Sequence, residues 1–374
     1  MIECEQEQTE GLDIGEGCAE PRQLMREILA VLPARRPTAA SWERFRSLEL
    51  AELLLSESER DQDAAPEKAR DLAWTAQLVA EQGYPPAEIP RVHAALARAR
   101  CLQGNALRLL GERVLAEVHF QAAVHFLTGA PISLERAFYC ERLASLREAQ
   151  GRFDEAAALL WRAVGIYRSA RRFEAQGQCL CRVAFLAFHD GQLEAASRLF
   201  SQARGLLSFE LSPGLLAKCS LGFAVCLALI GEVDQALFLK KEGLVLAEKA
   251  TDGRVLLEIE WLSGRLAAAL GENEQAEKRL GLVRRHLVQQ GRLTEAALCS
   301  LDVARVFVST DREEQIGELI AELQAAFPVS VDQVRMLVAL QDFRKAVAND
   351  LNVESASRTA LDLIRRPGAI LNKI

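Results

Sequence analysis

Cysteine and histidine are the side chains of this sequence that most readily act as metal ligands or nucleophiles. The chain of 374 residues contains nine cysteines and five histidines. No two cysteines form a CxxC pair, no two histidines stand four residues apart, and no HExxH motif occurs. Because such spacing usually marks zinc and redox sites, we predict no metal and no cofactor. A metal site would need ligands that the fold brings together from distant positions.

Sequence motifs of enzyme active sites are also missing. The sequence has no GxxxxGK[ST] loop for a phosphate, no GxSxG turn for a nucleophilic serine, and no recognisable family signature that pairs cysteine with histidine. We therefore predict that the protein is not an enzyme. An active site built from scattered residues stays open as the alternative.

Charge is concentrated at one end of the sequence. The formal net charge is −7, and residues 1–20 contain seven acidic and no basic side chains, so that the other 354 residues carry 45 of each sign. This balance argues against direct binding of nucleic acid or of an anionic membrane. Residues 1–20 also lack the basic and apolar regions of a signal peptide, and no stretch approaches 18 uninterrupted apolar residues. We predict a cytoplasmic protein with an acidic disordered tail over residues 1–20.

Glycine recurs at an interval of forty residues and so reveals how the chain is built. It occupies positions 111, 151, 191, 231 and 271, and Asp311 stands at the next position of the series. Seven residues before each position stands a small residue, namely Gly104, Ala144, Ala184, Ala224, Gly264 or Ala304. Five residues after it stand Ala116, Ala156, Ala196, Ala236, Ala276 and Ile316. Nine residues after it stand Phe120, Leu160, Phe200, Lys240, Leu280 and Ile320, most of which are bulky and apolar.

Each forty-residue unit predicts two antiparallel helices joined at the glycine. The segment before the glycine is apolar with helical spacing, and glycine tolerates the positive φ of a tight turn. Acidic residues follow in the first turn of the second helix, as in "GRFDEA" at 151–156. The small residue seven positions earlier lets the two helices approach closely. Because one hairpin cannot bury both of its faces, neighbouring hairpins must stack.

Six cysteines fall ten to twelve residues before the turn positions, where a small apolar side chain would pack. We predict that they are buried structural thiols. They are Cys101, Cys140, Cys179, Cys181, Cys219 and Cys299.

The repeat resembles the tetratricopeptide repeat. The segments "GNALRLLGERVLAEVHFQAA" (104–123) and "GRFDEAAALLWRAV" (151–164) place a small residue, a turn glycine, alanine and a bulky apolar residue at the offsets of that family. The period departs from the usual 34 residues and resembles the long-repeat arrays of bacterial regulators. HEAT-like repeats share the longer period and are the alternative. The resemblance implies an all-α, right-handed superhelical solenoid of stacked antiparallel hairpins.

The register of the repeats predicts the division of the chain. After the tail at 1–20, residues 21–94 are predicted to form capping helices and a degenerate repeat. Residues 95–325 are predicted to form six hairpins, and residues 326–374 closing helices.

The resemblance also implies a concave groove lined by the first helix of each hairpin. Its exposed positions correspond to those ten, six and three residues before the turn. The candidate partner-binding residues at these positions are Asn105, Arg108, Glu141, Phe185, Phe188, Leu221, Val225, Trp261, Arg265 and Arg305. This set predicts an apolar middle between polar or charged ends, suited to an extended peptide or amphipathic helix whose acidic groups meet Arg265 and Arg305.

Three alternatives to this groove stay open. Tighter curling of the solenoid would bury Phe185 and Phe188 in ordinary packing, and Trp261 would then be core. The convex face could bind the partner instead. Asn105 and Arg108 are also the residue types of the clamp that some tetratricopeptide grooves close on a terminal carboxylate.

Two functions fit these expectations. The first is a regulatory scaffold or adaptor that binds another protein through the groove. The second is a sensor whose array changes pitch on binding a peptide or other ligand and so controls a transcription factor or effector. We also raise the hypothesis that the acidic tail occupies the Arg265 and Arg305 end of the groove when no partner is bound.

Overall fold

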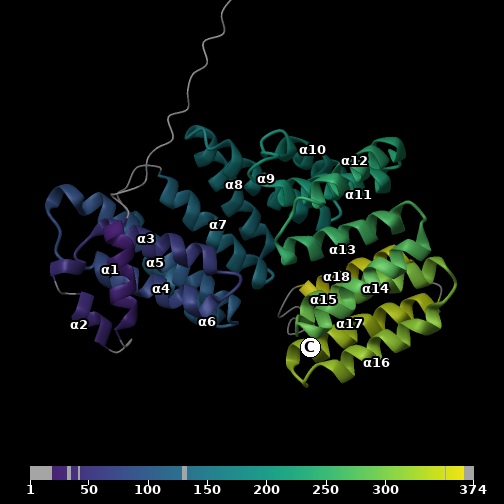
Figure 1. Cartoon of the computed structure of the whole chain (residues 1–374). Coiled ribbons are helices and arrows are strands. Elements are labelled where there is room, and N and C mark those ends of the chain that lie inside the picture. Colours follow the sequence, from purple (N-terminus) through teal and green to yellow (C-terminus); the bar gives the residue numbers. More distant parts are fainter. Residues whose placement is uncertain (1–18, 32–34, 41–42, 129–132, 350, 366–374) are drawn as a thin grey trace, which may run out of the picture. The chain divides into compact units, whose positions relative to one another are not determined.

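All regular structure in the described part of the chain is helical (Figure 1). The computed structural model describes residues 19–31, 35–40, 43–128, 133–349 and 351–365, and no strand occurs among them. The chain forms two compact units, Met1–Leu146 and Arg147–Ile374, which we call unit 1 and unit 2. The predicted all-α class is confirmed. The acidic tail at 1–20 falls almost wholly outside the described residues.

Unit 1 contains a succession of antiparallel helices that ends within α7. Its α-helices are α1 (Ala19–Ala30), α2 (Arg36–Ala40), α3 (Leu48–Asp61), α4 (Pro66–Ala80), α5 (Ile89–Leu109), α6 (Arg113–Leu127) and most of α7 (Leu134–Ala149). Short 3-10 turns at Glu43–Phe45 and Pro86–Glu88 precede α3 and α5.

Unit 2 continues with helices of similar length. They are α8 (Phe153–Ser169), α9 (Phe173–His189), α10 (Leu193–Arg204), α11 (Pro213–Ile230), α12 (Val233–Ala247), α13 (Gly253–Ala269), α14 (Asn273–Gln289), α15 (Leu293–Ser309), α16 (Ile316–Ala326), α17 (Val331–Ala348) and α18 (Val353–Arg365). The predicted boundaries at residues 95 and 325 mark where the repeat pattern begins and ends, whereas the two units are defined by their compactness. These boundaries therefore stay a prediction.

The forty-residue glycines end the first helix of each predicted hairpin. Gly111, Gly151, Gly191, Gly231 and Gly271 have φ between 72° and 97°, and Asp311 keeps the same left-handed conformation at 54°. At Gly151 the amide donates to the Glu148 carbonyl and the next amide donates to the Arg147 carbonyl. This is the Schellman arrangement, which satisfies carbonyls at a helix C-terminus.

Two of the left-handed turns in the described residues lie outside the forty-residue pattern. Arg171 and Gly291, which join a second helix to the next first helix, have φ of 54° and 69° and close the same pair of backbone bonds. Because arginine gives no sequence signal for this conformation, the twenty-residue interval of turns was not visible in the glycines alone.

At both glycines of the row of small residues, the small residue faces the bulky residue of the same hairpin. A Cβ added at Gly104 would lie 3.0 Å from the Phe120 ring, and one at Gly264 would lie 2.8 Å from the Leu280 side chain. The four alanines of the same row are fully buried. The predicted close approach of the two helices is confirmed, and it is the repeated unit of the core.

Helix α11 is apolar around most of its circumference and packs against four other helices. It contacts α9, α10, α12 and α13. By length and composition it is the one helix of the described residues that could cross a membrane, but 61% of its residues are buried in unit 2. A helix that is hydrophobic all round is typical of the centre of a large core.

Candidate functional site

Polar and aromatic side chains from the first helices of successive hairpins meet on one side of unit 2. The Arg265 guanidinium on α13 lies 5.9 Å from the ring centroid of Phe188 on α9. Helix α11 packs between α9 and α13. Side chains of these two flanking helices can meet across α11 only on the side toward which the row of helices curves. We call this concave side the inner face of unit 2, and it consists of Glu148, Arg182, Phe185, Phe188, Lys218, Glu258, Trp261, Arg265, Asp302 and Arg305.

Asp302 holds the best-satisfied cluster of the inner face. Its Oδ2 accepts hydrogen bonds from Trp261 Nε1 and Arg265 Nε, both at 2.7 Å. The Arg265 guanidinium also lies 4.9 Å from the Trp261 ring. The side chains of Arg265 and Asp302 are only 15% and 14% exposed. Such a desolvated, hydrogen-bonded ion pair fixes the positions of α13 and α15 relative to each other.

Two further ion pairs join successive first helices on the inner face. Arg182 on α9 donates to Glu148 at the end of α7 over 2.7 Å. Lys218 on α11 pairs with Glu258 on α13 and lies 5.0 Å from the Phe185 ring centroid. The cations of this face are therefore mostly matched by carboxylates, and its aromatic rings lie between them.

Five predicted groove residues of unit 2 lie on the inner face, and two do not. Phe185, Phe188, Trp261, Arg265 and Arg305 belong to it. Phe185 also packs edge-on against the buried Phe200 ring, with centroids 4.8 Å apart, so part of its surface serves the core.

The predicted exposure of the apolar middle is wrong for Leu221 and Val225. These residues are 0% and 2% exposed. Leu221 fills the space left by Gly243 of α12, where an added Cβ would lie 2.9 Å from Leu221 Cγ. The helices packed around α11 cover these two positions, which an open groove would expose.

The three predicted groove residues of unit 1 have different surroundings. Asn105 is 3% exposed, and its Nδ2 donates to Gln62 Oε1 at 2.8 Å, so its predicted exposure is also wrong. Arg108 Nε donates to Asn105 Oδ1 at 2.9 Å. The Asn105 amide is buried and bonded inside the unit, whereas a clamp would need it exposed to a carboxylate. Glu141 is half-buried.

Arg305 meets the C-terminal helix. Its guanidinium lies 3.4 Å from a Glu354 carboxylate oxygen on α18, and α18 packs against α15 and α17 (Figure 1). An acidic side chain therefore does lie at the Arg305 end, but it comes from α18. The hypothesis about the acidic tail concerns residues outside the described ones.

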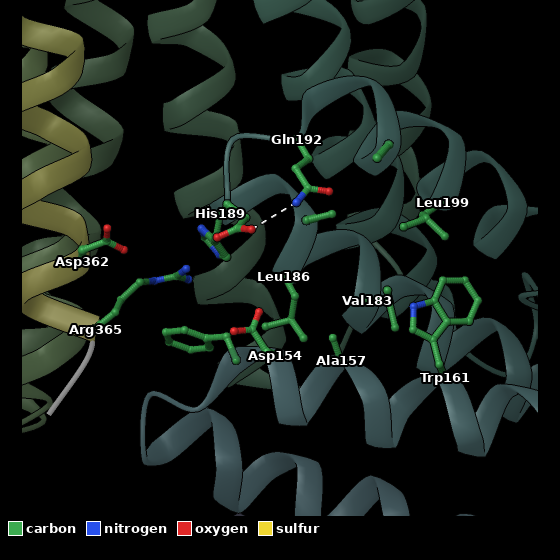
Figure 2. A pocket seen from close by; sticks show the side chains of 14 residues that line it. Asp154, Ala157, Trp161, Val183, Leu186, His189, Gln192, Leu199, Asp362 and Arg365 are labelled. Carbon is green, nitrogen blue, oxygen red and sulfur yellow. Dashed lines mark hydrogen bonds between the residues drawn. The ribbon is translucent and has the colours of Figure 1, made fainter.

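A cavity of about 310 Å³ opens beside the inner face, where α8, α9, α10 and the end of α18 come together (Figure 2). Its lining residues are Phe153, Asp154, Ala157, Trp161, Val183, Leu186, Ala187, His189, Asp190, Gln192, Ala195, Leu199, Asp362 and Arg365. No predicted groove residue is among them. The available signal was Trp161, a large aromatic at an offset where the other repeats have Gln121, Ser201, Lys241, Gly281 and Ala321.

Burial and nearby positive charge lower the pKa of two residues that line this cavity, His189 and Arg365. The pKa of His189 lies well below its ordinary value because of desolvation, with additional repulsion from Arg365, Arg265 and Lys218. Desolvation, followed by repulsion from Arg265, lowers the pKa of Arg365 to about 10. His189 is consequently neutral at pH 7, whereas Arg365 remains a cation.

The predicted structural role of the six cysteines agrees with their surroundings. All six are buried thiols without a disulfide. Burial raises the pKa of Cys101 and Cys299, which makes these thiols poor nucleophiles. Within the described residues, no group of three or more histidine, cysteine or acidic side chains could hold a metal ion.

Comparison with known proteins relates the fold of this chain to solved helical-repeat structures. A structure of a Rap protein complexed with competence and sporulation factor matches with a TM-score of 0.62 and 14% identity, over 84% of this chain and 88% of that one. Aspartyl phosphate phosphatase F from Bacillus subtilis matches with a TM-score of 0.57 and 13% identity, over 76% and 73%. No family model and no curated protein matches the sequence. The likeness confirms the tetratricopeptide-like fold class, and at this identity it establishes the fold alone.

Proposed function

We propose that this chain is a non-catalytic regulatory protein that binds another protein or a peptide on the inner face of unit 2. The proposal rests on Phe188 and Trp261, whose half-exposed aromatic side chains lie among fixed charges on a concave surface. Aromatic and arginine side chains are enriched where binding energy concentrates. A structurally similar Rap protein was solved with competence and sporulation factor, and the fold is thus known to hold such a complex.

The chemistry of the inner face favours a segment with both apolar and charged side chains. Phe188 offers an apolar contact, while Arg182, Lys218 and Arg265 are already neutralised by carboxylates. A partner that relied on charge alone would have to break these pairs. We therefore expect an amphipathic helix or extended peptide anchored by an apolar residue.

A peptide-responsive sensor is the second candidate, since the same surface would receive a short ligand. The two candidates differ in the area that binding covers. An adaptor should bury on the order of 1,200 Å² or more with a folded partner. A sensor should be saturated by a short peptide.

The non-catalytic and cytoplasmic character of the protein belongs to the proposal. One structural neighbour is named as a phosphatase of aspartyl phosphate. Release of phosphate from phosphorylated partner protein is therefore the activity to measure, and we expect none above the spontaneous rate.

A pull-down with tagged protein, read by mass spectrometry, tests the proposed surface. Phe188→Asp places a charge on the inner face, whereas Phe238→Asp makes the same change on α12 at a side chain that is 68% exposed. We expect a partner that is retained by the parent and by Phe238→Asp but lost from Phe188→Asp, with both variants folded by circular dichroism. Loss from Phe238→Asp alone would move the binding site to the outer surface.

A further inference from the structure

Arg365 places a guanidinium at the edge of the cavity without an ion pair to any described residue. It is the last residue of α18, and its guanidinium extends between His189 and the α8 side of the cavity (Figure 2). The guanidinium lies 5.3 Å from the Phe153 ring centroid, and no hydrogen bond or ion pair joins it to any described residue. Burial and the nearby Arg265 lower its pKa to about 10, although Glu148, Asp302 and Asp362 act in the opposite direction. A desolvated guanidinium in this position favours an anionic ligand such as a carboxylate.

Carboxylates line the same end of the cavity. Asp154 stands in the first turn of α8, and Asp190 follows the last residue of α9. Asp190 accepts a hydrogen bond from Gln192 Nε2 at 3.1 Å, and neither carboxylate forms an ion pair with a described residue. Receptors for opposite charges therefore stand close together without neutralising each other.

The other end of the cavity is apolar. Figure 2 shows Trp161, Val183 and Leu199 on the side away from Arg365. Trp161 is 47% exposed, so a large ring surface faces the opening without being covered by protein. The cavity volume of about 310 Å³ is at the small end of the range for small-molecule binding sites. A cavity of this size suits a ligand of one or two amino-acid residues.

We propose that this cavity binds a small zwitterion with a bulky apolar side chain, either a free amino acid or a dipeptide. The ligand carboxylate pairs with the Arg365 guanidinium, and its ammonium group lies between Asp154 and Asp190. The apolar side chain lies against Trp161 and Leu199. This site is separate from the inner face, and the inference does not depend on the proposed function.

The position of the site gives such a ligand a mechanical role. Helix α8 begins unit 2 and α18 ends the described part of it, and the Arg358 guanidinium already lies 3.8 Å from the place that a Cβ on Gly191 would take. A ligand held by Asp154 and Arg365 joins the two ends of the row of hairpins. Hydrogen exchange in α18 should therefore slow when the ligand binds.

Calorimetric titration of the full chain tests the assignment of each ligand group. The probes are L-phenylalanine, L-leucine and the dipeptide Leu-Leu, with phenylalanine amide and N-acetylphenylalanine as derivatives that lack the anion or the cation. We expect saturable binding of at least one zwitterion and a loss of at least about tenfold for both derivatives. The stronger of the amino-acid and dipeptide arms identifies the source of the ligand.

Matched variants separate binding from structure. Arg365→Gln should weaken binding at least about tenfold. Arg358→Gln, on the same helix but not lining the cavity, should leave it unchanged. Trp161→Ala, which does not alter α18, should weaken binding while Phe238→Ala does not.

Three results would overturn the proposal. The first is the absence of saturable binding for every zwitterion at roughly 10 mM. The second is equal affinity of the parent and Arg365→Gln, and the third is equal affinity for phenylalanine and its two derivatives. Partner capture by the inner face is measured separately, so failure here leaves the proposed function standing.

Discussion

Arginine stacks on phenylalanine in both units, but the two sites differ in their anions. In unit 1 the guanidiniums of Arg98 and Arg142 lie 5.2 and 4.8 Å from the Phe138 ring centroid, and both donate to Glu59. In unit 2 Arg365 lies 5.3 Å from the Phe153 ring centroid, and no described carboxylate pairs with it. The first site contains a carboxylate that pairs with both guanidiniums, whereas the second has no such partner among the described residues.

This difference separates structural arginines from candidates for binding. The Glu59 network links α3, α5 and α7 through one carboxylate that both arginines share, and on the inner face of unit 2 the Asp302 carboxylate pairs with Arg265. An unmatched guanidinium costs stability unless a ligand or solvent compensates it. Substitutions at the paired arginines and their carboxylates should therefore affect folding, whereas substitution of the unpaired Arg365 should affect ligand binding.

Asp302→Ala should have the largest effect, because it turns a complete site into an incomplete one. It removes the acceptor of both Trp261 and Arg265 and leaves a nearly buried guanidinium unpaired. We expect a loss of about 2 to 3 kcal/mol in the free energy of unfolding, measured by urea denaturation followed by tryptophan fluorescence. Asp302→Asn, which keeps an acceptor, should lose less. A loss below about 0.5 kcal/mol would show that the cluster is not structural.

The stability of the protein should decrease on acidification because His189 is buried near positive charges. Its folded pKa lies below the ordinary value of 6.5, so below pH 6.5 the unfolded chain binds a proton that the folded chain does not. Stability should therefore fall as pH decreases from 6.5 toward the folded pKa, by at most about 1.4 kcal/mol per pH unit from this group. In His189→Gln this part of the pH dependence should disappear. An unchanged dependence would assign it to other groups.

Glu59→Gln should make the unit 1 site resemble the Arg365 site. Because its three charged side chains are about one third exposed, water compensates much of the loss. We expect a decrease of about 1 kcal/mol or less in the free energy of unfolding, with a shallower dependence on salt. A stabilised variant would contradict the interpretation that the pairing of Glu59 with both arginines stabilises unit 1.

Arg365→Gln should have the smallest effect on folding. Since no described carboxylate loses a partner, we expect a change within about 0.5 kcal/mol in urea denaturation, or a slight gain. A loss above about 1 kcal/mol would mean that the guanidinium holds α18 in place, and the contrast between the two units would fail.

The repeated core could be predicted from sequence because its geometry recurs. The same steric requirement recurs at each turn glycine, and another recurs at each small residue seven positions earlier. Even Asp311 keeps the left-handed turn. Arg171 gives no such signal, although its backbone adopts the same left-handed turn.

The candidate sites were less accessible to such reasoning because they depend on curvature. Offsets from the turn placed Phe188, Trp261 and Arg265 on the inner face, but the same offsets failed for Leu221 and Val225, which lie on a helix covered by four neighbours. The cavity depends on the return of α18 to α8. No periodic pattern encodes a contact between residues about two hundred positions apart.

Photo-crosslinking from the inner face tests the central claim most directly. A benzoylphenylalanine at position 188, compared with one at the exposed position 238 on α12, reports which surface lies against a partner in lysate. The account predicts a single crosslinked protein from position 188 and none from position 238, and the captured sequence should contain an amphipathic segment. A partner crosslinked from position 238 but not from 188 would contradict binding on the inner face.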